Sequence, residues 1–148
     1  MKKVKVIIAD DSKINNEMLI KEFENDSNIE ILGVAEDGIQ EYELIKKFNP
    51  DLVITDNQMP NMTGVEVIQQ VSKESFLLKP KFILVSGDSF KTFPKDFNVI
   101  RIFGKPVNYD VLKEFIVDYF SDESKNEENI QTITQVSLLK KIKKYFMK

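Results

Sequence analysis

The stretch LVITDNQMPNMTG, at residues 52–64, decides the fold of this chain. It begins with a short apolar run, continues to Asp56, and ends in residues that favour turns. The pattern predicts a buried strand with Asp56 at its carboxyl end, where open α/β sheets bind their ligands. Taken alone, the stretch favours a simpler role for Asp56, the capping of a turn. The rest of the chain has to decide between the two.

Four further apolar runs have the length of strands: residues 4–9, 29–35, 82–85 and 99–103. Between and after them, apolar residues recur at helical spacing. These helical patterns contain Ile14, Met18, Leu19 and Phe23; Ile39, Tyr42, Ile45 and Phe48; Val65, Ile68 and Val71; and Val111, Leu112, Phe115, Ile116, Tyr119 and Phe120. Strands that alternate with helices predict a parallel sheet with right-handed crossovers. Polar interruptions in the runs at 29–35 and 99–103 place those two strands at the sheet edges.

One connection departs from this regular alternation. The segment 88–98 is short for a full helix between the last two strands. Phe90, Phe93 and Phe97 have helical spacing, but Pro94 lies among them and interrupts helices. We expect a short or irregular helix here, with at least one of the phenylalanines closing the core.

The composition excludes several kinds of function. The chain has 148 residues, a formal net charge of −3, and neither histidine nor cysteine. The length indicates one domain with a tail. The net negative charge argues against direct nucleic-acid binding. The lack of histidine and cysteine excludes disulfides, thiol nucleophiles and a Ser-His relay. Any metal must bind to oxygen ligands, which favours Mg²⁺. Since the apolar runs are too short to cross a membrane and Asp10 and Asp11 interrupt any signal peptide, we expect a cytoplasmic protein.

Charged and hydroxyl side chains follow the strands at one edge of the predicted sheet. They are Asp10 and Asp11 after the first strand, Asp56 after the third, Ser86 after the fourth, and Lys105 after the fifth. Three neighbouring carboxylates repel each other unless a cation or a proton intervenes. One lysine leaves the group net negative. The sequence therefore predicts a divalent-cation site with Asp11 and Asp56 as direct ligands and Asp10 acting through water.

In these residues the chain resembles the receiver domain of two-component response regulators, the phospho-acceptor fold of bacterial signalling. The resemblance covers residues 3–120. It rests on Asp10-Asp11, on Asp56 followed by MPNMTG, on Ser86-Gly87 and on Lys105-Pro106, each at the expected strand end. It implies a doubly wound, flavodoxin-like α/β fold with five parallel strands in the order 2-1-3-4-5.

The resemblance also implies a mechanism. Asp56 would accept a phosphoryl group from a sensor histidine kinase or a phosphotransfer protein and switch the chain's binding to an output protein. Mg²⁺ would be held by Asp11, Asp56 and the Gln58 carbonyl, Lys105 would pair with the acyl phosphate, and Ser86 would bond one of its oxygens. The Lys105-Pro106 peptide is expected to be cis. Such a chain performs phosphorylation and slow dephosphorylation on itself and is not an enzyme in the usual sense.

One position departs from the family pattern. Three residues before Lys105 the family usually carries a tyrosine or phenylalanine that rotates during switching, and here the residue is Ile102. Phe103 is adjacent, but successive side chains of a strand face opposite ways. We therefore expect a remodelled signalling face around the fifth strand and an output that uses another surface.

Three alternatives remain beside this interpretation. A receiver-fold interaction module that is never phosphorylated would have little use for the complete acidic set and Lys105. A hydrolase of the haloacid dehalogenase kind needs a second aspartate two residues after the nucleophile, where this chain has Gln58. A flavodoxin needs a phosphate-binding loop after the first strand, where Asp10 and Asp11 would repel phosphate.

We divide the chain into a receiver domain (1–120), a linker (121–129) and an amphipathic basic helical tail (130–148). The linker could equally be an extension of the last helix. The tail has an apolar side and a basic side, formed by Leu138, Leu139, Ile142, Tyr145 and Phe146 and by Lys140, Lys141, Lys143, Lys144 and Lys148. Its candidate partners are its own domain, a second copy of the chain, a partner's groove and a membrane surface, of which the first two are favoured.

Overall fold

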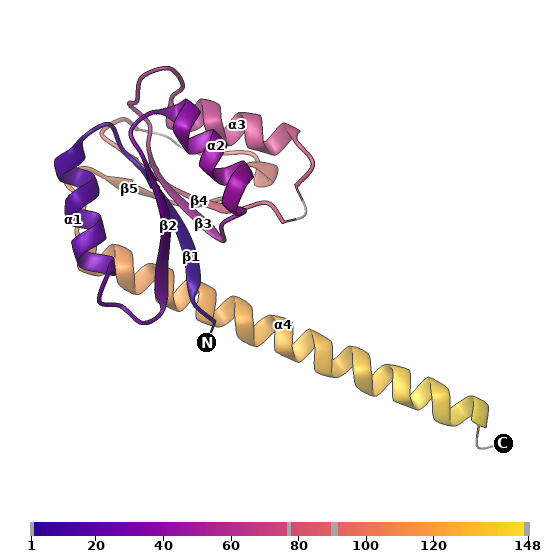
Figure 1. Cartoon of the computed structure of the whole chain (residues 1–148). Coiled ribbons are helices and arrows are strands. Elements are labelled where there is room, and N and C mark those ends of the chain that lie inside the picture. The colour runs from indigo at the N-terminus through magenta and orange to yellow at the C-terminus, as the bar shows by residue number, and fades with distance from the viewer. Residues whose placement is uncertain (1, 77, 90–91, 147–148) are drawn as a thin grey trace. The chain divides into compact units, whose positions relative to one another are not determined.

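The computed structural model describes residues 2–76, 78–89 and 92–146. Five parallel strands form one sheet in the order β2-β1-β3-β4-β5, which confirms the predicted fold (Figure 1). The strands are β1 (Val4–Ala9), β2 (Ile29–Ala35), β3 (Leu52–Asp56), β4 (Lys81–Ser86) and β5 (Val99–Gly104). The α-helices of the described residues are α1 (Lys13–Phe23), α2 (Gly38–Phe48), α3 (Gly64–Lys73) and α4 (Tyr109–Phe146).

Helices cover both faces of the sheet, with α2 and α3 on one face and α1 on the other (Figure 1). The three central strands β1, β3 and β4 are mostly apolar because both of their faces are largely buried. Val53 of β3 packs into the cluster beneath α2 and α3, whereas Ile54 and Leu19 of α1 line the same pocket. By the same alternation, Thr55 faces α2 and Asp56 faces the side of α1. This division of β3 between two faces positions both halves of the site described below.

Each helix that follows a strand begins with a side-chain cap. Ser12, Asp37 and Thr63 accept hydrogen bonds from backbone N–H groups of the first turns of α1, α2 and α3. Thr63 forms a reciprocal capping box with Glu66. Ser12 and Asp37 lie within three residues of the ends of β1 and β2, whereas a loop at 57–62 separates Thr63 from β3. The caps fix where each helix begins beyond the edge of the sheet.

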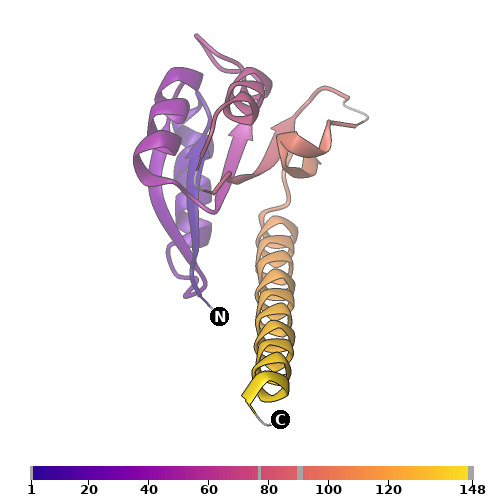
Figure 2. The ribbon, with the colours of Figure 1, turned by 90° about the vertical axis from the view of Figure 1, so that its right-hand side faces the viewer.

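The connection between β4 and β5 contains one short 3₁₀ turn, η1 (Lys95–Phe97), among the residues described there (Figure 2). This confirms the expected irregular helix. Phe93 and Phe97 lie 6.2 Å apart between ring centroids and pack against the core. Phe90 lies outside the described residues.

We expected Ile14 and Met18 on the buried, apolar side of α1, and this prediction is wrong. Ile14 is 69% exposed and Met18 is 46% exposed, whereas Leu19 and Phe23 are buried. An 11-residue helix against a sheet buries one narrow stripe, and Leu19 and Phe23 occupy it. Ile14 and Met18 are left at the surface of the molecule.

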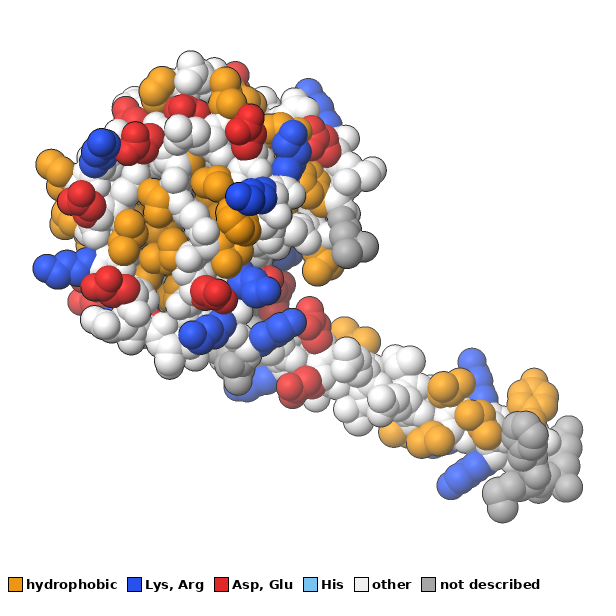
Figure 3. Space-filling model, in the orientation of Figure 1, with side chains coloured by type: hydrophobic (Ala, Val, Ile, Leu, Met, Phe, Trp, Pro, Cys, Tyr) orange, Lys and Arg blue, Asp and Glu red, His pale blue; other side chains and the backbone are white. Residues whose placement is uncertain are grey.

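Helix α4 runs without a break from Tyr109 to Phe146, so the segment 121–129 is helical (Figure 2). The chain divides into two compact units, Lys2–Lys113 and the part from Glu114 onward. In the second unit, Leu138, Leu139 and Ile142 are exposed, and basic side chains lie beside apolar ones near the end of the helix (Figure 3). No helix among the described residues is long and apolar enough to span a membrane.

Candidate acidic site at the carboxyl edge of the sheet

The register of the strands brings the predicted site residues to one edge. Ala9 of β1 lies opposite Thr55 of β3, so the residues that follow them, Asp10 and Asp56, are neighbours. Ser86 of β4 lies opposite Gly104 of β5, the residue before Lys105. Parallel strands end at the same edge, and the central position of β3 makes Asp56 the middle of the group.

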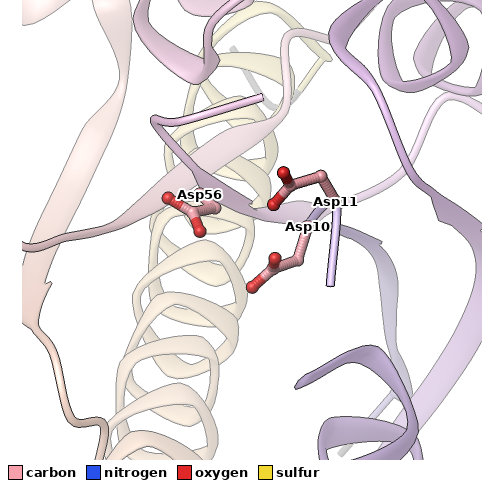
Figure 4. Close-up of side chains that lie close together, drawn as sticks. All are labelled: Asp10, Asp11 and Asp56. Atoms are coloured by element: carbon pink, nitrogen blue, oxygen red, sulfur yellow. The ribbon is translucent and has the colours of Figure 1, made fainter. Parts of the chain in front are cut away.

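Three carboxylates meet at this edge. Oxygens of Asp10, Asp11 and Asp56 all lie within 4.8 Å of one another, and Figure 4 shows the three side chains gathered together. Asp10 and Asp56 are buried, whereas Asp11 is exposed. The structure thus assembles an all-oxygen donor set with one side open to solvent. Such a set suits a hard divalent cation, which retains waters in its open positions.

Asp10 is held in place by hydrogen bonds to both of its carboxylate oxygens. The Ser12 backbone N–H donates to Oδ1 (2.9 Å), and the Asn15 side-chain amide donates to Oδ2 (3.1 Å). The amide of Asn16, which is buried, donates to the Asp10 main-chain carbonyl (2.8 Å). Asn15 and Asn16 were not among the residues predicted for the site. The sequence pattern that could have indicated them is a pair of asparagines in the first turn of the helix that follows the aspartate pair.

Asp56 is held from two directions. Its Oδ1 accepts a hydrogen bond from the Gln58 backbone N–H (3.0 Å), and its Oδ2 accepts one from the Lys105 ammonium, with which it forms a salt bridge. Partial burial lowers the pKa of Lys105. The hydrogen bond to Asp56 and the charges of Asp56, Asp10 and Asp11 outweigh that effect, so the pKa is raised overall. Lys105 therefore stays charged beside Asp56.

The remaining predicted residues lie near Asp56 and Lys105. Ser86 is buried at the end of β4, and its hydroxyl accepts a hydrogen bond from the Asp88 backbone N–H (3.0 Å). The peptide between Lys105 and Pro106 is cis, as expected. The Gln58 side chain is exposed, so it contributes to Asp56 through its main chain.

A largely apolar pocket of about 540 Å³ adjoins the acidic site on the α1 side. Asp10, Asp56 and Lys105 line its polar end, and its apolar walls include Met18, Leu19, Ile54, Val85, Val107 and Leu112. Charged groups at one end of an apolar cleft are typical of binding sites in which a few polar atoms fix orientation.

The sheet order and the acidic edge define a flavodoxin-like α/β protein with a candidate cation site at its topological switch point. The response regulator receiver domain family matches residues 6–117 of the chain. The chain therefore belongs to the response regulator receiver domain family.

Several known proteins are similar to the chain. A protein-glutamate methylesterase/protein-glutamine glutaminase of Methanococcus maripaludis is 29% identical over 150 residues, which cover 97% of this chain and 41% of that protein. The response regulator domain of Thermotoga maritima CheB has a TM-score of 0.66 at 18% identity and covers 82% of this chain and 96% of its own. A chain of the CheX-CheY-BeF3-Mg+2 complex of Borrelia burgdorferi has a TM-score of 0.67 at 22% identity, covering 80% and 90%.

The two solved structures support the fold. The chain spans less than half the length of the Methanococcus methylesterase that it matches, and about a fifth of a Pyrococcus horikoshii relative that is 35% identical over 72 residues. The similarity therefore concerns only part of those longer proteins.

Proposed function

We propose that this receiver domain accepts a phosphoryl group on Asp56 from a phosphohistidine of a sensor histidine kinase or phosphotransfer protein, in the presence of Mg²⁺. We further propose that phosphorylation changes its affinity for an output protein. The observation that carries the proposal is the meeting of Asp10, Asp11, Asp56 and Lys105 at one edge, because two buried carboxylates beside a third are costly without a function.

The donor set fits a magnesium ion. Three carboxylates and one ammonium leave a net negative charge, all nearby ligand atoms are oxygens, and Asp11 leaves one side open. Asp11 and Asp56, with the Gln58 main-chain carbonyl, would hold Mg²⁺, and Asp10 would contribute through water. When bound, the ion supplies positive charge that neutralises the phosphoryl oxygens.

The chain's own residues position the acceptor. A carboxylate oxygen of Asp56 forms a bond to phosphorus while the bond from phosphorus to the donor's imidazole nitrogen breaks, and that electron pair stays on the nitrogen. Lys105, already bonded to Asp56, would pair with the acyl phosphate, and the Ser86 hydroxyl would turn from Asp88 to donate to a phosphoryl oxygen. In dephosphorylation, attack by water on phosphorus releases inorganic phosphate and restores the Asp56 carboxylate.

The exposed apolar residues of α1 support docking of a phosphodonor protein beside the site. Ile14 and Met18 are exposed large hydrophobic residues, and Met18 lines the pocket that reaches Asp56. The double substitution Ile14→Ser with Met18→Ser should slow phosphotransfer from a phosphohistidine protein by about tenfold or more and leave acetyl phosphate as efficient as before.

The output surface is proposed to differ from the usual one. Ile102 is half-buried and packs against the core cluster, and η1 stands in the connection where a full helix is usual in the family. Both features support a switch that does not depend on rotation of an aromatic side chain at this position. We further propose a receiver domain at 1–120, a connecting segment at 121–129 and a partner-binding tail at 130–148, acting in the cytoplasm, where phosphohistidine donors are formed.

The test is phosphorylation by acetyl phosphate with Mg²⁺, followed by intact mass. The chain should gain one phosphoryl group, Asp56→Asn should gain none, and removal of Mg²⁺ with EDTA should abolish the reaction. Asp96→Asn is the matched control, because Asp96 is an exposed aspartate of η1. If the wild-type chain gains no mass and binds no beryllium fluoride, the chain is an interaction module with a receiver fold and the proposal is wrong.

A further inference from the structure

A buried carboxyl group lies on the opposite side of β3 from the acidic site. Glu41 of α2 is 0% exposed. Its Oε2 has one contact, with the Thr55 hydroxyl, and its Oε1 is buried without a hydrogen-bond partner among the described residues. A buried carboxylate needs a cation or several donors to remain ionised. The acceptance of phosphate by Asp56 makes no direct use of Glu41, so its presence in the core calls for another reason.

Thr55 connects Glu41 to the phospho-acceptor. The alternation of β3 turns Thr55 toward α2 while Asp56, the next residue, turns toward the acidic site. The Thr55 Oγ1 lies 3.0 Å from Oε2 of Glu41 and 3.2 Å from the main-chain carbonyl oxygen of Asp56. One hydroxyl therefore touches both the buried carboxyl group and the backbone of the residue that takes the phosphoryl group.

The number of donor hydrogens available for the two contacts of the Thr55 hydroxyl indicates whether Glu41 is charged. A threonine hydroxyl has one hydrogen to donate, and the Asp56 carbonyl has none. If both contacts of Thr55 are hydrogen bonds, Thr55 donates to Asp56 and accepts from Glu41. Glu41 must then carry a proton. In the other arrangement, an ionised Glu41 receives one hydrogen bond and keeps its other oxygen buried and bare, which is costly.

The surroundings of Glu41 favour the protonated form. Burial raises the pKa of Glu41 well above its usual value, and this effect is larger than the lowering that a hydrogen bond donated by Thr55 to an ionised Glu41 would cause. Helix α2 packs against β1, β2 and α3. The charged residues of β1, β2 and α3, the C-cap residue of α3 and the other charged residues of α2 are all exposed or half-exposed. They are Lys5, Glu30, Glu66, Lys73, Glu74, Glu43, Lys46 and Lys47. Asp56, beyond Thr55, is paired with Lys105.

A second contact shows that the Asp56 carbonyl is tightly enclosed. Gly64 begins α3, and a Cβ placed on it would lie 2.6 Å from the Asp56 carbonyl oxygen and 2.9 Å from Thr55 Oγ1. Neither distance leaves room for a side chain or an intervening atom. The peptide after Asp56 is therefore enclosed by Thr55, backed by Glu41, and by the first residue of α3.

We propose that Glu41 is held as an uncharged carboxylic acid and acts as a positioning residue, fixing the Thr55 hydroxyl against the Asp56 main chain so that the phospho-acceptor carboxylate is correctly aimed. This rests on the proposed function of Asp56. Glu41 touches neither the phosphoryl group nor the cation. Its effect is to fix the backbone from which the Asp56 side chain extends.

The charge of Glu41 is tested directly by infrared difference spectroscopy at pH 7 of the wild-type chain against Glu41→Gln. We expect the wild type to show a carboxylic acid C=O band that Glu41→Gln lacks. Only carboxylate bands in the difference spectrum would overturn the proposal. This readout requires no phosphorylation.

The positioning role is tested by the rate of phosphorylation with acetyl phosphate at saturating Mg²⁺, on variants that remain folded by circular dichroism. Glu41→Gln can donate to Thr55 from its amide and should react within about threefold of wild type, as should Thr55→Ser. Glu41→Leu and Thr55→Val remove the connection and should react about tenfold more slowly or worse. Ile45→Val, a buried change on the same helix, lowers stability without touching Thr55 and should keep the wild-type rate.

The outcomes separate this inference from the function on which it rests. A wild-type chain that takes no phosphoryl group overturns both. A wild-type chain that reacts, with folded Glu41→Leu and Thr55→Val reacting equally fast, leaves the phospho-acceptor intact and overturns the positioning role. Slow reaction of these two together with rescue in Glu41→Gln and Thr55→Ser supports it, because a loss of packing alone would also slow Ile45→Val.

Discussion

Lys105 and Asp56 form a salt bridge across 49 residues of sequence, and this pair joins the fifth strand to the third at the edge where β1 brings two further carboxylates. Lys105 follows β5, which β4 separates from β3 in the sheet. The pair therefore depends on the packing of β3, β4 and β5 side by side. It also leaves the acidic site with one positive charge for three negative ones.

Replacement of Lys105 by glutamine should tighten the binding of Mg²⁺ while slowing the chemistry that depends on the lysine. The site loses its one ammonium, so its net negative charge grows and attraction for a dication increases. Stability without Mg²⁺ should fall by about 1 kcal/mol, a small value because the Lys105 side chain is 37% exposed and solvent screens the pair. Titration calorimetry measures the affinity, and urea unfolding measures the stability.

Lys113→Gln is the matched control for this change. Lys113 also forms an ion pair, with Glu22 at 3.8 Å, and its side chain is similarly exposed at 32%. It lies outside the acidic set, so its replacement should leave Mg²⁺ affinity unchanged. Equal Mg²⁺ affinities for wild type and Lys105→Gln would contradict the proposed net charge of the site.

The two neighbouring aspartates that follow β1, Asp10 and Asp11, should respond differently to the same substitution. Asp11→Asn should weaken Mg²⁺ binding by about tenfold or more and stabilise the metal-free protein by about 1 kcal/mol, because it removes one charge from a repelling cluster at an exposed position. Mg²⁺-dependent thermal shifts and urea unfolding in EDTA measure the two effects.

Asp10→Asn should weaken Mg²⁺ binding and also destabilise the protein, by about 1–3 kcal/mol. Both Asp10 oxygens accept hydrogen bonds, from Ser12 and from Asn15, and an asparagine would turn an NH₂ donor toward one of these donors. Equal unfolding free energies for Asp10→Asn and Asp11→Asn would show that the hydrogen bonds to Asp10 do not contribute to stability.

The sequence predicted the parts of this structure that repeat along the chain. Five apolar runs were sufficient for the strands, and the polar residues just after three of these runs were sufficient to place Asp10, Asp56 and Lys105 together, because parallel strands end at a common edge. The pattern could not assign Ile14 and Met18, since both fit the helical spacing and only the width of the α1 contact leaves them exposed. The exposure of these two side chains depends on how α1 packs against the sheet rather than on the periodicity of the sequence.

Polar residues of the interior were missed for a related reason. Glu41 lies in an amphipathic helix where a glutamate is ordinarily placed in solvent, and Thr55 looks like one more β-branched strand residue. Neither residue is unusual alone. Their contact exists because the alternation of β3 and the rotation of α2 turn both to the same point, and this rotation is not encoded in local spacing. Asn15 and Asn16 were missed in the same way.

Gly64→Ala should destabilise the protein and disturb the acidic site together. An added Cβ would lie 2.6 Å from the Asp56 carbonyl oxygen, so either α3 or the end of β3 has to move. We expect a loss of about 1–3 kcal/mol in the free energy of unfolding, as for other overpacked sites, and a slower reaction with acetyl phosphate. Urea unfolding and phosphorylation rates are the measurements.

Gly87→Ala provides the comparison. A Cβ on Gly87 would meet nothing within 4 Å, and none of the glycines has a positive φ angle. Its effect should be neutral or stabilising by about 0.4–1 kcal/mol through the unfolded chain. If Gly64→Ala proved as harmless as Gly87→Ala, the Asp56 carbonyl would not be enclosed as tightly as described.

The stability of the wild-type chain should carry a pH dependence from Glu41 that Glu41→Gln removes. Burial raises the pKa of Glu41 above its usual value of 4.5, so the folded state keeps a proton that the unfolded state releases. The favourable contribution of this proton is complete below the unfolded pKa. It is lost progressively as pH rises from there through the folded pKa, at up to about 1.4 kcal/mol per pH unit. Urea unfolding from pH 4.5 to 8 should therefore show Glu41→Gln gaining stability relative to wild type as pH rises. A constant difference over that range would mean that Glu41 ionises in the folded protein as it does in the unfolded chain.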